Sequence, residues 1–217
     1  MAETLPNPIK EMMLKQADND TYEPMPNSYA ITTLLYCLRK RYFQQTLPKK
    51  LTELKTAVNF YRGNLWDRNL TGLFKRNQVR STYRCRNVPI SISGKFDFLT
   101  EDGVITDLKC PATLYYVKKD GQPSIHYKKQ VLFYAYCNAI NKAQIMYWDG
   151  SECLIYPVEV TDENCRELID ELESKAMILW SAFQRGKAPA KNVCNPEPWE
   201  CRSGCDFKTE CCGETTL

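Results

Sequence analysis

ISISGKFD (residues 90–97) and VITDLK (residues 104–109) decide the fold of this 217-residue chain. Each stretch has the apolar residues of a short β-strand, and Gly103 supplies the turn of a hairpin between them. We therefore expect Asp97, Asp107 and Lys109 to lie together at one edge of a sheet.

Two carboxylates and one ammonium at a single sheet edge indicate a metal site. Carboxylates that lie so close together repel each other unless a cation lies between them. Oxygen ligands favour a hard ion such as Mg²⁺ or Mn²⁺. A neighbouring lysine can polarise a water or stabilise charge on a phosphate oxygen. We interpret Asp97, Asp107 and Lys109 as a metal-dependent phosphodiester site, although each aspartate taken alone would more simply be a turn residue.

Composition places the chain among soluble globular proteins of about one domain. Hydrophobic residues make up 43% of the chain and aromatic residues 12%, which is enough to build a core. No apolar run approaches the ~20 residues that a membrane span needs, and the N-terminus lacks the apolar region of a signal peptide. We expect a cytoplasmic protein with no membrane partner.

The net charge of +3 conceals an asymmetry between two parts of the chain. Residues 37–86 contain thirteen Lys and Arg against Glu53 and Asp67, a local net charge of +11. Aromatic residues are interleaved with these basic residues, a composition that suits a polyanion with stackable bases. Nucleic acid is the expected partner, and a solvated helix face is the alternative.

Periodicity predicts an α/β fold with one mixed sheet. Residues 1–27 are polar and are expected to form an extended arm, and residues 110–124 a loop. The predicted helices cover about 28–47, 51–76, 125–141 and 162–185, and the predicted strands about 78–86, 89–100, 104–109, 143–148 and 153–160. The second helix is expected to place Leu54, Val58, Tyr61, Leu65 and Leu73 on one stripe.

Further motifs give a resemblance to a known family. A helix containing YCLRKRYF (residues 36–43), Gly94-x-x-Asp97, Asp107-x-Lys109 and Gln130-x-x-x-Tyr134 follow one another in that order. Together they resemble PD-(D/E)xK nucleases of the RecB type, and within that group the CRISPR-associated exonuclease family called Cas four. The resemblance implies a restriction-endonuclease-like mixed sheet flanked by helices. It divides the chain into an arm (1–27), a helical segment (28–77), a nuclease core (78–186) and a cysteine tail (187–217).

The resemblance also implies roles for the motif residues. Asp97, Asp107 and the Leu108 carbonyl would hold Mg²⁺ or Mn²⁺, Lys109 would position the attacking water, and Gln130 and Tyr134 would contact the substrate. The two latter residues are four apart, so they share one helix face.

RecB-type nucleases usually add a histidine ligand on the second helix, where this chain has Asp67. Asp67 is an oxygen donor and is expected to bind the same metal, with surface pairing to Arg68 as the alternative. His126 is the one histidine of the chain and lies outside the expected place.

Eleven cysteines include five near the C-terminus: Cys194, Cys201, Cys205, Cys211 and Cys212. Four cysteines can hold a [4Fe–4S] cluster or a structural zinc. Remote Cys37 together with Cys201, Cys205 and Cys211 is similar to the iron–sulfur pattern of the family. The family spacing is C-x₂-C-x₅-C, whereas here three residues separate the first pair, so Cys194 or Cys212 remains an alternative ligand.

The expected function is that of a Mg²⁺- or Mn²⁺-dependent DNA exonuclease that acts on single-stranded DNA or DNA ends. The resemblance implies that the protein trims prespacers in CRISPR adaptation. It also implies CRISPR integrase proteins as partners and a homo-oligomer as a possible assembly. The alternatives are a stand-alone viral or host recombination or repair nuclease of the RecB type and a non-catalytic DNA-binding subunit.

Overall fold

The computed structural model describes residues 5–19, 27–48, 53–193 and 205–212. The chain forms two compact units. The first unit comprises Met1–Glu23, Leu51–Ser81 and Lys95–Thr161, and the second comprises Pro24–Lys50, Thr82–Gly94 and Asp162–Leu217.

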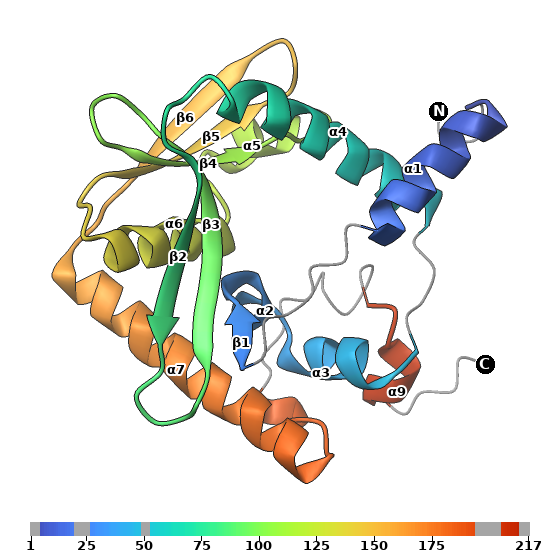
Figure 1. Cartoon of the computed structure of the whole chain (residues 1–217), viewed down its shortest axis with the longest axis vertical. Helices are drawn as coiled ribbons and strands as arrows, with labels where there is room; N and C mark the ends of the chain where they lie inside the picture. Colours follow the sequence, from blue (N-terminus) through green and yellow to red (C-terminus); the bar gives the residue numbers. More distant parts are fainter. Residues whose placement is uncertain (1–4, 20–26, 49–52, 194–204, 213–217) are drawn as a thin grey trace. The chain divides into compact units, whose positions relative to one another are not determined.

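A six-stranded mixed sheet runs in the order β1-β3-β4-β5-β6, and β2 pairs with β3 off this path (Figure 1). Its strands are β1 (Ser28–Ala30), β2 (Asn77–Arg84), β3 (Ser91–Leu99), β4 (Ile105–Lys109), β5 (Ala143–Trp148) and β6 (Cys153–Val158). The five strands predicted from the sequence are confirmed within a few residues, as is the mixed sheet flanked by helices.

In the first unit, β4 pairs antiparallel with the end of β3 and parallel with β5, and β5 pairs antiparallel with β6. Helix α6 (Ile125–Asn138) packs on β4 and β5 (Figure 1). It begins at Ser124, whose Oγ accepts from the backbone N of His126 at 3.3 Å, a regular N-cap. It buries Val131, Phe133 and Tyr134 against the strands that carry the site motifs.

Three features of the first unit differ from the predictions. Residues expected in an extended arm form α1 (Asn7–Asn19), which packs on α4 (Leu54–Thr71). The stripe expected on α4 is not buried: Leu65 is 48% exposed, and Leu73 lies beyond the helix and is 77% exposed. The loop expected over residues 110–124 contains α5 (Tyr115–Asp120).

In the second unit, the helix predicted over residues 28–47 is instead a strand followed by two short helices. Ser28 begins β1, which pairs parallel with β3, and the Ser28 and Ser93 hydroxyls hydrogen-bond at 3.1 Å. Extended backbone at Tyr36 (φ −107°, ψ −172°) then separates α2 (Ile31–Leu35) from α3 (Leu38–Thr46).

Helix α7 (Asp162–Arg185) has the predicted bounds and packs against α2 and α3 (Figure 1). Buried residues follow it at helical spacing: Cys165, Leu168, Ile169, Leu172, Glu173, Ala176, Leu179 and Ala182. The tail adds a 3₁₀ turn (Lys191–Val193) and α9 (Lys208–Cys212), which packs on α3.

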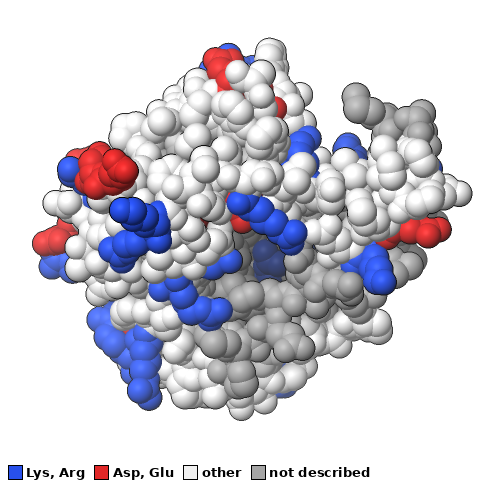
Figure 2. Space-filling model, turned by 45° about the horizontal axis from the view of Figure 1, so that its top comes forward, with Lys and Arg blue, Asp and Glu red and all other residues white. Residues whose placement is uncertain are grey.

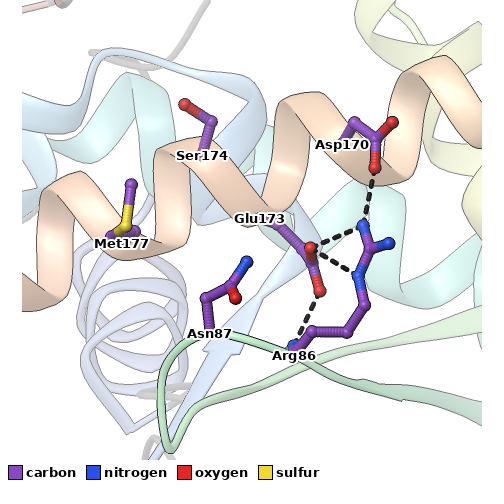
Figure 3. A pocket seen from close by; sticks show the side chains of 6 residues that line it. All are labelled: Arg86, Asn87, Asp170, Glu173, Ser174 and Met177. Atoms are coloured by element: carbon purple, nitrogen blue, oxygen red, sulfur yellow. Dashed lines mark hydrogen bonds and ion pairs between the residues drawn. The ribbon is translucent and has the colours of Figure 1, made fainter.

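One charged side chain in this buried row ties the β2–β3 hairpin to α7. Glu173 accepts from Tyr83 Oη at 2.8 Å, from the Arg86 backbone N at 2.7 Å and from Arg86 Nε at 2.8 Å. Glu173 and Arg86 border a pocket of about 380 Å³ that Asn87, Asp170, Ser174 and Met177 also line (Figure 3). Because the Glu173 carboxylate bonds to Tyr83 and Arg86, we interpret this group of residues as a structural contact that holds the hairpin against α7.

Among the residues that the structure describes, no helix has the length and apolar character needed to cross a bilayer.

Candidate active site

The two aspartates of the opening motifs face each other across the β3–β4 ladder. The pairs Phe98↔Thr106 and Leu99↔Ile105 fix an antiparallel register, and its continuation places Asp97 opposite Asp107. Asp97 Oδ2 accepts from the backbone N of Leu108 at 2.5 Å. The sequence placed Asp97 at a strand end, whereas β3 continues to Leu99, so the carboxylate projects from within the sheet.

Lys109 adds a positive charge beside this pair. Its Nζ lies 2.5 Å from Asp107 Oδ2, and the side chains are 22% and 2% exposed. The same ammonium lies over the ring of Tyr127, 4.7 Å from its centroid, which is the distance of a cation–π contact. Lys109 is therefore held from two sides, by a carboxylate and by an aromatic ring.

Burial and mutual repulsion perturb the ionisation of this group. Burial, and after it the neighbouring Asp107 carboxylate, raise the pKa of Asp97 to about 7 against the opposing effects of Lys109 and the Leu108 backbone. Burial lowers the pKa of Lys109, but Asp107 and Asp97 outweigh it, so its pKa lies above the ordinary value. A second cation near the two carboxylates would relieve their repulsion.

Gln130 and Tyr134 lie on one face of α6, as predicted, and they contact each other. Gln130 Nε2 donates to Tyr134 Oη at 2.7 Å. Burial raises the pKa of Tyr134, and the Asp107 carboxylate raises it further. The structure thus brings this pair within electrostatic reach of Asp107.

Asp67 belongs to the same electrostatic neighbourhood. Burial raises its pKa, Lys95 and the Gln78 side chain lower it, and Asp107 raises it. Gln78 Nε2 donates to both Asp67 carboxylate oxygens, at 3.0 and 3.1 Å. The observed partner is therefore Gln78, rather than the Arg68 considered as the alternative.

Helix α4 is fixed over this edge of the sheet by two contacts that the sequence did not indicate. The Trp66 and Trp148 rings meet edge to face with centroids 5.9 Å apart. Arg62 Nη2 donates to the Cys110 carbonyl at 3.4 Å, just past Lys109. Together they hold Asp67, the neighbour of Trp66, toward the end of β4.

The oxygen donors of the site suit a hard cation, but few of them come from the protein. Asp107 Oδ2 is buried and has no hydrogen bond of regular geometry, although Lys109 lies beside it. Within residues 5–19, 27–48, 53–193 and 205–212, no three His, Cys, Asp or Glu side chains are grouped as ligands of one metal. Asp97, Asp107 and the Leu108 carbonyl therefore fit a site with few protein ligands, in which water completes the shell. His126 lies at the first turn of α6.

Cysteine thiols that could bind a metal lie in the second unit. Burial raises the pKa of the Cys205 thiol, the charges of Cys211 and Cys37 raise it further, and Lys40 lowers it. Arg39 Nε donates to Cys211 Sγ at 3.2 Å, and its Nη1 donates to the Pro189 carbonyl at 2.5 Å.

Three of the four predicted iron–sulfur ligands thus interact electrostatically, because Cys37 and Cys211 act on the Cys205 thiol, but in the described residues they are not grouped as ligands of one metal. Cys201 and the alternative Cys194 lie outside the described residues, as does the side chain of Cys212.

Basic side chains are prominent at the surface. Figure 2 shows more Lys and Arg than Asp and Glu atoms on the face drawn. On β2 the side chains of Arg80 and Arg84 are exposed and lie on one face of the strand, because they are four residues apart.

Solved structures share this fold. The chain aligns with the structure of SSO0001 at a TM-score of 0.67 and 19% identity, covering 96% of this chain and 98% of that one. It aligns with an alkaline exonuclease from Laribacter hongkongensis at 0.55 and 14% identity, covering 73% and 91% of the two chains. A phage-related exonuclease from Haemophilus somnus 129PT gives 0.51 and 13%, covering 78% and 99%.

These likenesses show that the chain shares the mixed α/β fold of the two exonucleases, a mixed sheet flanked by helices. No protein-family model matches the sequence, and a search of curated proteins finds no match.

Proposed function

We propose that this chain is a metal-dependent deoxyribonuclease. The observation that carries the proposal is the opposition of half-buried Asp97 and buried Asp107 across β3 and β4, with Lys109 paired to Asp107. Two carboxylates and an ammonium on two adjacent strands are the groups that phosphodiester hydrolysis needs. The exonucleases that share the fold support the same conclusion.

Each residue has a distinct role in the proposed reaction. Asp97, Asp107 and the Leu108 carbonyl would hold Mg²⁺ or Mn²⁺, which when bound lowers the pKa of a water and stabilises charge on the phosphate. Lys109 places its ammonium where a water is oriented or phosphate charge develops, and Asp107 and Tyr127 fix that position. Gln130 would offer its amide to the substrate from α6, and the buried Tyr134 would act through its hydrogen bond to Gln130.

Asp67 is proposed as an auxiliary ligand that acts through a metal-bound water. Its carboxylate interacts electrostatically with Asp107 and Lys109, and Gln78 fixes its orientation. A carboxylate in this role hydrogen-bonds to a water on the ion and does not coordinate the ion directly.

The finer features of the proposal are exonucleolytic action on single-stranded DNA or DNA ends and a cytoplasmic location. Trimming of prespacers, association with CRISPR integrase proteins and assembly of copies of the chain rest on the motif resemblance. A stand-alone recombination or repair nuclease has the same chemistry, and genomic neighbours would distinguish the two roles.

A [4Fe–4S] cluster held by Cys37, Cys201, Cys205 and Cys211 is the proposed structural cofactor. The support for it is the electrostatic effect of Cys37 and Cys211 on the Cys205 thiol in the second unit. When bound, the cluster would tie the C-terminal tail to the segment between α2 and α3.

Degradation of 5′- and 3′-labelled DNA in defined metals tests the proposed activity. The wild-type chain should shorten single strands with Mn²⁺ or Mg²⁺, and Lys109→Ala should lose this activity by more than about 100-fold. Lys142→Ala, which removes an exposed lysine at the start of β5, should leave the rate unchanged. If Lys109→Ala cleaves as fast as the wild type, the chain is a binding subunit or cleaves by another site.

A further inference from the structure

Two exposed tyrosines lie on the short helix that joins the two halves of the candidate site. Helix α5 follows β4, which ends at Lys109, and precedes α6, which carries Gln130. Tyr115 is 61% exposed and Tyr116 is 66% exposed. Their rings meet edge to face with centroids 5.2 Å apart. Because both rings are exposed and in contact with each other, they present one continuous aromatic surface to solvent.

Helix α5 is held firmly despite its short length. Leu114, which precedes it, is buried, and its backbone hydrogen-bonds to the Asp149 carboxylate. Near its other end, Lys118 Nζ lies 2.6 Å from Glu152 Oε2. Asp149 and Glu152 both belong to the β5–β6 turn, so the turn holds the helix at two points. The tyrosines therefore project from a fixed support.

The support lies next to the proposed catalytic lysine. Lys109 pairs with Tyr147 in the β4–β5 ladder. Asp149, which contacts Leu114, is two residues beyond Tyr147, a distance of about 7 Å along an extended chain. Tyr115 directly follows Leu114, whose contact with Asp149 lies two residues beyond the strand partner of Lys109.

The chain around the pair is basic. Residues 109–129 contain five lysines and one aspartate, a local net charge of +4 with His126 neutral. Lys119 is exposed on the same helix. Positive charge interleaved with exposed aromatic rings favours a polyanion that carries flat, stackable groups over an apolar protein surface.

We propose that Tyr115 and Tyr116 form a stacking platform for unpaired bases of a DNA strand whose phosphate enters the Asp97–Asp107–Lys109 site. The inference rests on the proposed function and names the substrate feature that the site selects. Base faces are covered in a duplex and exposed in a single strand, so the platform selects single-stranded ends. Because every base has a π-face, it imposes little sequence preference.

Binding measured without divalent metal separates the platform from catalysis. The probes are a fluorescent oligothymidylate and an abasic strand of the same length and charge, and the readout is anisotropy. The variants are the double substitutions Tyr115→Ala/Tyr116→Ala and Tyr115→Phe/Tyr116→Phe. Ile155→Ala is the control, because it removes a side chain of the same unit that is 54% exposed.

The platform predicts that the wild type binds oligothymidylate more tightly than the abasic strand. The double alanine variant should lose about 10- to 100-fold in affinity for oligothymidylate and almost none for the abasic strand. The phenylalanine variant and Ile155→Ala should stay within about threefold of the wild type.

Equal affinity of the wild type for both strands overturns the platform, as does an alanine variant that weakens both strands alike. Nuclease activity with no base-dependent binding would refute the platform alone. Base-dependent binding lost in the alanine variant of an inactive protein would refute the nuclease alone.

Discussion

Asp67 lies where the motif resemblance predicts a metal ligand, and its environment assigns it a testable role. Gln78 Nε2 holds both carboxylate oxygens, and Asp107 and Lys109 act on its ionisation. Asp67→Ala should raise the Mn²⁺ concentration for half-maximal cleavage by about 10- to 100-fold, the usual cost of losing an outer ligand. A metal titration of the cleavage rate measures this.

Arg68→Ala is the matched control, because Arg68 is the exposed neighbour of Asp67 on α4. Its metal requirement should equal that of the wild type. An unchanged requirement in Asp67→Ala would show that the carboxylate serves only to fix Gln78.

For single residues, short spacings in the sequence predicted which site residues lie together, but no sequence pattern predicted the contacts made by packing. Asp97, Asp107 and Lys109 could be predicted together because a hairpin of known register brings near neighbours in sequence face to face. Tyr127 over Lys109 and Gln78 on Asp67 depend on how helices settle on the sheet, which no local pattern encodes.

Among the elements, the contact of the β2–β3 hairpin with α7 depends on one buried carboxylate (Figure 3). Burial raises the pKa of Glu173, but hydrogen bonds from Arg86 and Tyr83 outweigh it and lower the pKa below its ordinary value of 4.5. A depressed carboxyl pKa contributes stability that is present above the unfolded value and lost as pH falls through the folded value.

Glu173→Gln should therefore lower Tm by about 5 °C at pH 7, and the difference from the wild type should shrink as pH falls below about 4.5. Thermal unfolding followed by circular dichroism across that range measures it. Asp170→Asn is the control, because Asp170 also pairs with Arg86 but its side chain is 70% exposed. A pH-independent difference would mean that Glu173 stabilises the hairpin by packing alone.

Long periodic segments gave the most accurate element predictions. Helix α7 has the predicted bounds because its buried row repeats over many turns. The segment after Ser28 misled because β1 is held by β3, a partner more than sixty residues away. Helix α1 was missed because its sequence is mostly polar and its packing partner, α4, lies far along the chain.

For the whole molecule, the cysteines determine whether a cofactor links the tail to the N-terminal part of the second unit. Protein purified without oxygen should be brown, absorb broadly near ~400 nm and contain roughly four irons per chain. Cys205→Ala should lose colour and iron, whereas Cys153→Ala, which removes an exposed cysteine on β6, should keep both. A colourless wild type with one bound zinc would contradict the cluster.

The central claim is that Asp97 and Asp107 form the metal-dependent hydrolytic centre. Its most direct test is the single-turnover cleavage rate of labelled single-stranded DNA with Mn²⁺, compared between Asp107→Asn and Asp102→Asn. Asp102 is an exposed aspartate on the turn of the same hairpin. We predict that Asp107→Asn loses more than about 100-fold in rate while Asp102→Asn cleaves like the wild type. Equal rates in the two variants would contradict the claim.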